Sequence, residues 1–219
     1  LLIVAIAALR EMHAPAAYEP LLKTFFTVSY VALAAFVGAF ADSMPKWRVM
    51  FISNAIKVIG CAMMFFSVHP LIAYAVVGLG AAAYSPAKYG ILTEYLPHRL
   101  LVVANGWIEG LTVGAIILGV VIGGTLIQPN IAHKLLDFDL PLFETGIDCV
   151  CEMALLFVAA FYIVAAIFNL YIPETGVPHK VLHKNPYYLI REFNHCLMLP
   201  WRDRLGQISL AVTTLFWGA

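Results

Sequence analysis

The sequence predicts an all-α protein that crosses a membrane several times. Of its 219 residues, 62% are hydrophobic and 12% are charged, with a mean hydropathy of +0.87, whereas a soluble domain is roughly 45–50% apolar and about 25% charged. The apolar residues gather in runs of about 20, the length that a helix needs to cross the hydrocarbon layer. The formal net charge is zero, so no basic surface argues for nucleic acid as a partner.

Six apolar segments are predicted to be spans: 1–9, 21–41, 49–68, 71–96, 100–127 and 150–172. Turns rich in charge, proline or histidine separate them, at 10–20, 42–48, 69–70, 97–99 and 128–149.

Three parts of the chain follow from this pattern. We expect a six-span bundle over 1–172 whose first span is incomplete, a polar loop over 173–204, and the start of a seventh span over 205–219. This organisation predicts the N-terminal half of a two-half transporter, truncated within its seventh span, with the missing C-terminal half as its first partner.

The distribution of Lys and Arg predicts the orientation. Eight of them lie in the turns 42–48 and 97–99 and in the loop 173–204, which share one side, and three lie on the other side. The positive-inside rule therefore places the loop 173–204 in the cytoplasm.

The stretch 80–90 contains the strongest local signal. Pro86 has no N–H to donate and its ring crowds the carbonyl of Ala82, so a bend or break of the span is expected there. Lys88 follows at once, and a charge at membrane depth costs roughly 2.5–3.5 kcal/mol on insertion scales, so it should face protein or a water-filled cavity. A broken span that carries a charge is typical of the binding sites of transporters.

Other polar residues also fall within spans. Glu109 lies four residues after Asn105 on the same helical face, and it is a candidate counter-charge for Lys88 or Lys57, or a cation or proton site. Lys57 and Asn54 lie three apart and also share a face. The structural alternatives are a snorkelling Lys88, a buried ion pair and simple packing of a polar face.

Small residues at 106, 110, 114, 119, 123 and 124 run along the fifth span. Glycine at such a spacing lets another helix approach the backbone closely, so we expect this span to pack tightly against a neighbour.

The segment 187–193 mixes apolar and basic residues within the loop 173–204. It is either a tether between two halves, which we favour, or a segment that lies on the membrane surface.

The sequence offers little for an enzyme or a metal site. The four cysteines are scattered, and the seven histidines form no metal-binding spacing. A membrane-embedded enzyme of lipid metabolism would need a base near a nucleophile, and Ser85 has no histidine within a turn or two in sequence.

The loop Gly38-x-x-Ala41-Asp42-x-x-x-Lys46-x-Arg48 resembles the signature loop between spans two and three of the major facilitator superfamily. Its glycine lets helices approach, its carboxylate caps a helix or pairs with a base, and its cations stay on the cytoplasmic side. Such a cluster is expected to act as a latch that holds two halves together in one state. The alternative is an ordinary turn whose charges only fix orientation.

Within that superfamily, the segment 82–92 resembles the bacterial lysophospholipid transporters, as do Asn105-Gly106-x-x-Glu109 and the stretch 201–209. The resemblance implies a flippase that moves lysophosphatidylethanolamine and related lipids inward across the bacterial inner membrane by alternating access. It also implies Na⁺ as a coupling ion, no other cofactor, contact with membrane lipids, and functional coupling to an acyltransferase that re-acylates the lipid.

The residues expected to line or support the cavity are Lys88, Glu109, Lys57, Asn105, Asn54 and Tyr84, and those expected to form the latch are Gly38, Asp42, Lys46 and Arg48. The alternative function is a proton-coupled exporter of amphiphilic drugs with the same fold, in which Glu109 carries the proton.

Overall fold

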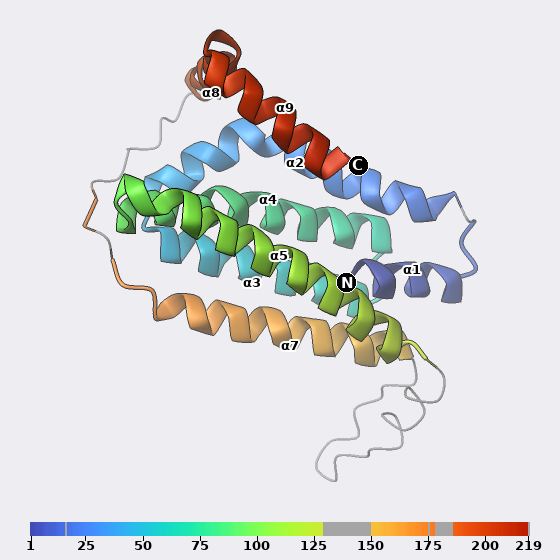
Figure 1. The fold of residues 1–219 in the computed structure, drawn as a ribbon. Coiled ribbons are helices and arrows are strands. Elements are labelled where there is room, and N and C mark those ends of the chain that lie inside the picture. Colours follow the sequence, from blue (N-terminus) through green and yellow to red (C-terminus); the bar gives the residue numbers. More distant parts are fainter. Residues whose placement is uncertain (16, 129–149, 175, 178–185, 219) are drawn as a thin grey trace.

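Helices account for nearly all of the chain that the structure describes. The computed structural model describes residues 1–15, 17–128, 150–174, 176–177 and 186–218. Its helices are α1 (Leu2–Glu11), α2 (Tyr18–Ser43), α3 (Lys46–Phe65), α4 (Pro70–Tyr95), α5 (His98–Leu126), α7 (Val150–Leu170), α8 (Pro186–Arg202) and α9 (Arg204–Gly218). Figure 1 shows α3, α4, α5 and α7 side by side along one common direction.

Proline sets the start of three of these helices. Pro45 and Pro97 come directly before α3 and α5, and Pro70 is the first residue of α4. Proline suits this position because the first turn of a helix has no use for its missing N–H. At α4, the Nδ1 atom of His69 also accepts a hydrogen bond from the N–H of Leu71 at 3.3 Å. The boundaries of these spans are therefore local properties of the sequence.

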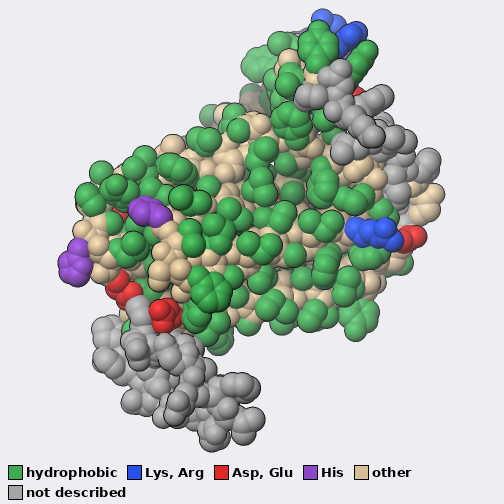
Figure 2. Space-filling view, turned by 180° about the vertical axis from the view of Figure 1, so that it is seen from behind, with side chains coloured by type: hydrophobic (Ala, Val, Ile, Leu, Met, Phe, Trp, Pro, Cys, Tyr) green, Lys and Arg blue, Asp and Glu red, His purple; other side chains and the backbone are tan. Residues whose placement is uncertain are grey.

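The helices α3, α4, α5 and α7 are each long and apolar enough to cross a membrane, judged by length and composition. The helix α2 is a fifth candidate if its two segments, Tyr18–Ala34 and Phe36–Ser43, form one span bent by 64°. Figure 2 shows the charged side chains near the two ends of the bundle, with a hydrophobic surface between them. The fold class, an all-α polytopic membrane protein, is confirmed.

The helix α4 lies at the centre of the bundle. It packs against α2 and α3, and α3 packs in turn against α7. Two clusters of buried hydrophobic residues join the helices of the bundle. The larger one is built from α1, α2, α3, α4 and α7, and the smaller one contains Ala41, Val49, Met50 and Ala87. Of the most apolar window of each helix, 56% is buried in α4 and only 6% in α5. The helix α5 is therefore the outermost of the long helices.

The expected break at Pro86 is wrong. The helix α4 runs without interruption from Pro70 to Tyr95, with Pro86 inside it. A proline in a helix interior costs about 3 kcal/mol relative to alanine, but Ala82, Ala83 and Ala87 around it are buried, so packing holds the helix together. Of the bend or break expected at Pro86, the break is therefore contradicted, while a break with a bend of 64° is found in α2.

The expected tight packing of α5 through its glycines is also not found in the described residues. A Cβ atom added at Gly106, Gly110, Gly114, Gly119 or Gly124 meets nothing within 4 Å, and one at the buried Gly123 would make only an ordinary contact with Ile3 of α1, at 3.5 Å. The close helix contacts occur at glycines of α3 and α4, where a Cβ at Gly60 would lie 2.4 Å from a methyl group of Val77. The glycines that bring helices together are therefore not the ones with the most regular spacing.

A helix occupies much of the segment in which we expected a connecting loop. The helix α8 spans 186–202, contacts α2 and α9, and is followed at once by α9. Asp203 separates the two, and its Oδ2 atom accepts a hydrogen bond from the N–H of Gly206 at 3.1 Å, which caps the start of α9. The acidic turn around residues 137–148 lies outside the described residues.

Candidate functional site

Lys57 lies in a cage of aromatic and amide groups between three helices. Its Nζ atom donates a hydrogen bond to Oδ1 of Asn54 at 3.2 Å, one turn earlier on α3. The same atom lies 4.4 Å from the ring centroid of Tyr84 on α4 and 5.4 Å from that of Tyr162 on α7. Aromatic faces attract a cation, so these rings stabilise the ammonium group where water is scarce.

Asn54 leaves one polar group of this cage without a partner. Its side chain is 2% exposed, and its Nδ2 amide group has no hydrogen-bond partner in the described part of the chain. A buried donor without a partner is costly, and it is a common mark of a place where a ligand or water binds.

Gly80 lets α3 and α4 come together beside Lys57. A Cβ atom at this position would lie 2.7 Å from the carbonyl oxygen of Ser53 and 2.9 Å from Cγ of Lys57. The aliphatic stem of Lys57 therefore packs against the backbone of α4 at Gly80. Its ammonium group is positioned by Asn54 and by the ring of Tyr84.

Lys88 lies between α4 and α5. Its Nζ atom donates to Oγ1 of Thr112 at 3.2 Å and lies 4.6 Å from the ring centroid of Tyr89. The hydroxyl of Thr112 donates in turn to the carbonyl of Ile108, so its oxygen is turned toward the lysine. Lys88 is half-buried. The prediction that it faces protein agrees with these contacts.

Glu109 lies one turn before Thr112 on α5, but it does not pair with a lysine. The hydroxyl of Tyr89 donates to its Oε1 atom, and its buried Oε2 atom has no partner in the described residues. The expected ion pair of Glu109 with Lys88 or Lys57 is therefore absent among these residues. Lys88 instead contacts the hydroxyl of Thr112 and the ring of Tyr89, and Glu109 instead accepts a hydrogen bond from the hydroxyl of Tyr89.

Asn105 is exposed on α5, one turn before Glu109, and joins neither lysine. Tyr84, by contrast, belongs to the Lys57 cage, and it shares a face of α4 with Lys88, four residues later. Lys88 therefore lies one helical turn along α4 from the Lys57 cage. In the described part of the chain neither lysine forms an ion pair with a carboxylate. Two cations without an acid on one side of α4, with the amide of Asn54 beside Lys57, are suited to bind an anion.

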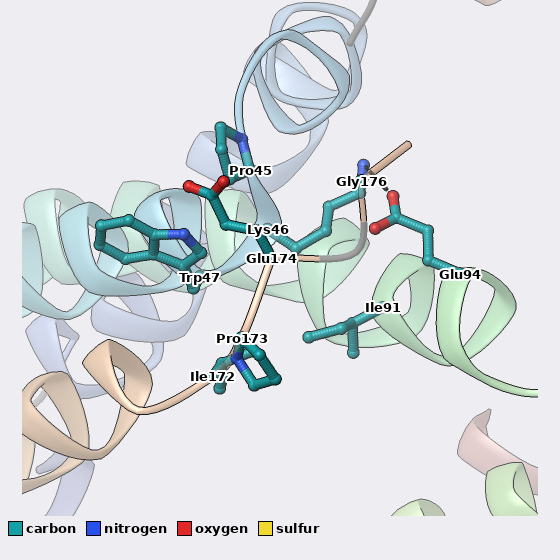
Figure 3. Close-up of a pocket in the computed structure, with 9 residues that line it drawn as sticks. All are labelled: Pro45, Lys46, Trp47, Ile91, Glu94, Ile172, Pro173, Glu174 and Gly176. Carbon is teal, nitrogen blue, oxygen red and sulfur yellow. Dashed lines mark ion pairs between the residues drawn. The ribbon is translucent and has the colours of Figure 1, made fainter. Parts of the chain in front are cut away.

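The predicted latch is built around Lys46, which is 8% exposed. Its Nζ atom donates to the carbonyl of Ala41 and to Oδ1 of Asp42, both at 2.8 Å, and lies 3.7 Å from Oε1 of Glu94. These groups come from the end of α2, the start of α3 and the end of α4, so one ammonium group joins three helices. Glu94 turns toward Lys46 in Figure 3.

A small cavity of about 50 Å³ lies beside this latch. It is lined by Pro45, Lys46, Trp47, Ile91 and Glu94, and the chain that leaves α7 closes it with Ile172, Pro173, Glu174 and Gly176 (Figure 3). The first residues after α7 therefore lie directly over the latch.

Two of the four predicted latch residues lie outside the ion-pair cluster. The guanidinium of Arg48 lies 5.0 Å from the ring centroid of Trp47 and is exposed. A Cβ atom at Gly38 would meet nothing within 4 Å, so in the described chain this glycine permits no close helix contact. The third charged member of the cluster is instead Glu94, whose carboxylate lies near Lys46.

Sequence reasoning missed four side chains of these sites: Glu94 in the latch, Tyr162 in the Lys57 cage, and Tyr89 and Thr112 at Lys88. Only Glu94 gave a signal, as an acid at the end of an apolar span on the side rich in Lys and Arg. The others are ordinary residues of apolar helices, and only the packing of α4, α5 and α7 reveals them.

Comparison with known proteins decides the family. Residues 1–219 match the Major Facilitator Superfamily. The chain belongs to the Major Facilitator Superfamily. This confirms the resemblance of the loop 38–48, and it makes the chain a multi-pass protein of a superfamily of transporters rather than an enzyme. The Oγ atom of Ser85 is paired with the hydroxyl of Tyr30 at 3.0 Å and donates to the carbonyl of Ala81 at 3.2 Å.

Within the superfamily, the chain is similar to proteins named lysophospholipid transporter LplT. It is 38% identical to that of Serratia proteamaculans and 36% identical to that of Yersinia enterocolitica, over all 219 residues in each case. It is also 38% identical to that of Yersinia pestis strain Pestoides F over the same length. The chain spans about half the length of these curated relatives, namely 50%, 49% and 49%.

Proposed function

We propose that this chain is the N-terminal half of a transporter that flips lysophospholipids inward across the bacterial inner membrane by alternating access, with help from sodium. The relatives named lysophospholipid transporter support the substrate class. The loop 173–204 is cytoplasmic in this proposal, and an acyltransferase consumes the lipid that arrives.

The observation that carries the proposal is the pair Lys57 and Lys88. Tyr84 contacts Lys57 and lies one turn before Lys88 on α4, neither lysine has a carboxylate partner among the described residues, and the buried amide of Asn54 beside Lys57 has an unused donor. A lipid phosphate supplies the negative charge and the acceptor oxygens that these groups lack. We assign the headgroup phosphate to this pair.

Glu109 accounts for the other end of the headgroup. Phosphatidylethanolamine-type lipids carry an ammonium group a few bonds from the phosphate, and the Oε2 atom of Glu109 is buried with no partner in the described chain. Tyr89 contacts Lys88 through its ring and Glu109 through its hydroxyl, so the cation and the carboxylate lie at different parts of the Tyr89 side chain. The zwitterionic headgroup would bind across Tyr89, with its phosphate at Lys88 and its ammonium at Glu109.

The latch gives the proposal a way to alternate between states. Lys46 joins the ends of α2, α3 and α4, and these helices lead directly to the two lysines. A movement that breaks the contact between Lys46 and Glu94 would change how the cytoplasmic ends of α3 and α4 pack, and would thus link the site to the cytoplasmic closure.

The test is uptake of labelled lysophosphatidylethanolamine into spheroplasts that express the protein from its complete gene, with and without sodium. Lys88→Ala should abolish uptake of every lysophospholipid because it removes the phosphate partner. Glu109→Gln should reduce uptake of lysophosphatidylethanolamine and spare that of lysophosphatidylglycerol, whose headgroup has no ammonium group.

The matched control is Lys23→Ala, since Lys23 is an exposed lysine of α2 far along the chain from the site. It should transport as well as the unmodified protein. Full uptake by Lys88→Ala at normal expression would overturn the assignment of the phosphate, and uptake that ignores sodium would overturn the coupling ion.

A second function, the proton-coupled export of amphiphilic compounds, is favoured by one observation. Glu109 is a half-buried carboxylate with a single hydrogen-bond donor, Tyr89, and an Oε2 atom without a partner in the described residues, which suits a group that takes up and releases a proton. Transport that stops when the pH gradient is collapsed, and that continues without sodium, would support this function in place of the first.

A further inference from the structure

The helix α8 separates its apolar and polar side chains onto two faces. Phe193, Cys196, Leu197, Pro200 and Trp201 follow one another at helical spacing and line one side of an apolar cleft. Arg191, His195 and Arg202 follow one another at the same spacing on the opposite face. Despite its amphipathic pattern, most of α8 is exposed in the described chain: Leu197 is 49% and Trp201 is 63% exposed.

The other wall of the cleft is a stripe along α9. Gln207, Leu210, Ala211, Thr214 and Leu215 line it, and together with α8 they enclose about 850 Å³. At 1.5 Å per residue, this stripe extends about 16 Å from the start of α9. The apolar face of α8 therefore points in the direction in which α9 runs.

The orientation of α8 differs from that of the bundle helices. Figure 1 shows α8 nearly end-on, beside α2 and at the start of α9, while α9 and the bundle helices lie across the view. The helix α8 thus runs across the direction of the helices that are long and apolar enough to span a membrane. A helix with this direction lies parallel to the plane of the membrane.

From this geometry we infer that α8 is an interfacial helix that binds the surface of the bilayer. Its apolar face enters the acyl region in the angle between α8 and α9, and lipid chains fill the cleft between them. Arg191 and Arg202, on the opposite face, reach the phosphates of anionic lipids. Tyr187, Tyr188 and Trp201 suit this depth, since Tyr and Trp are enriched at the boundary between membrane and water.

The charge of the segment fits an anionic lipid surface better than a protein partner. Residues 178–204 contain five Lys and Arg and two acids. Figure 2 shows Lys and Arg side chains at the outer edge of the molecule where α8 lies, beyond the hydrophobic belt. A basic polar face combined with an aromatic apolar face is the usual pattern of helices that lie in a lipid interface. The inference does not depend on the substrate, and holds for the lipid flippase and for the exporter alike.

The experiment is spin labelling of the protein, expressed from its complete gene and placed in nanodiscs of phosphatidylethanolamine and phosphatidylglycerol. In a background without other cysteines, one label replaces Leu197 on the apolar face and a matched label replaces His195 on the polar face. Both side chains are exposed in the described part of the chain, so both variants should fold. The measurement compares collisions of each label with oxygen, which concentrates in the bilayer, and with a water-soluble nickel chelate.

The inference predicts that the ratio of oxygen to nickel collisions is several-fold higher at 197 than at 195. It also predicts that the ratio at 197 falls in nanodiscs of phosphatidylcholine alone, because the two arginines then lose their anionic partners. Equal access of nickel at both positions would place α8 in water and overturn the inference. Shielding of position 197 from both reagents would also overturn it, because the apolar face would then be covered by another part of the protein. A ratio that ignores anionic lipid would overturn the role of the arginines.

Discussion

Replacement of Gly80 by alanine tests the close contact of α3 and α4 beside Lys57. The new methyl group would lie 2.7 Å from the carbonyl oxygen of Ser53 and 2.9 Å from Cγ of Lys57. The side-chain carbon can move, but the backbone oxygen can move only if the two helices separate. Because the site is at the centre of the buried part of α4, we expect this substitution to destabilise the bundle.

The magnitude follows from a comparison with a glycine that has open space. Gly110→Ala on α5 meets nothing within 4 Å and gains about 1 kcal/mol in helix propensity. Gly80→Ala has the same gain, but overpacking costs typically 1–3 kcal/mol, so the two variants should differ by about 1–3 kcal/mol. For chains of this size this corresponds to a difference of roughly 2–12 °C in the midpoint of thermal unfolding.

Two buried thiols provide the assay. Cys61 is 1% and Cys151 is 3% exposed, so a thiol-reactive dye reaches them only when the bundle opens. The exposed Cys196, and Cys149, are first replaced by serine. The dye is then followed on heating for the parent, Gly80→Ala and Gly110→Ala. If Gly80→Ala melts at or above Gly110→Ala, the two helices are not in the close contact described here and the reasoning fails.

Three further predictions use the same assay. Pro86→Ala should raise the midpoint by an amount equivalent to up to about 3 kcal/mol, because it returns an N–H to a helix that is already continuous. Lys57→Met should raise stability by about 1–3 kcal/mol, because an apolar side chain of similar length replaces a half-buried ammonium group, and yet it should abolish lipid uptake. Lys46→Gln should lower stability by about 1–3 kcal/mol because it removes the ammonium group that joins Ala41, Asp42 and Glu94, and the loss in the double variant with Glu94→Gln should be smaller than the sum of the two single losses.

Each of these predictions has an outcome that contradicts it. A lower midpoint for Pro86→Ala would mean that α4 needs a proline bend in the membrane. Normal uptake by Lys57→Met would remove this lysine from the phosphate site. A loss in the double variant equal to the sum of the losses in Lys46→Gln and Glu94→Gln would mean that Lys46 and Glu94 do not interact.

The spans were predictable because they depend on local properties. Runs of apolar residues set their lengths, and Pro45, Pro70 and Pro97 mark three of their starts. The same is true of the contact between Asp42 and Lys46, which are one helical turn apart, and of Lys57 and Asn54. In each case the sequence spacing alone brings the atoms together.

The errors arose where distant segments decide the outcome. Pro86 was expected to break its span, but burial of the neighbouring alanines holds α4 together. Glu109 was expected to pair with a lysine, but it accepts a hydrogen bond from the hydroxyl of Tyr89 instead. Which of several polar groups in a span meet depends on the rotation of each helix about its axis, and a single sequence does not encode that rotation in its spacing.

The helix α8 was obscured by composition. Its segment is rich in Pro, His and charged residues, which resembles a loop when residues are counted, whereas the order of the residues separates an apolar face from a basic one. A periodicity count over 186–202 would have detected it.

The cage of Lys57 has a consequence for selectivity. On the proposed function, two cations and an amide remain without an anion until the substrate arrives, and the protein pays for this in stability. A neutral lipid such as a monoacylglycerol would fit the apolar route, but it would cover these charges without satisfying them, and a site left with unpaired buried polar groups rejects such an analogue far more strongly than a mere loss of contact would suggest. The transporter would then discriminate against uncharged lipids because binding one leaves the two cations and the amide buried without an anion. No steric clash would be needed.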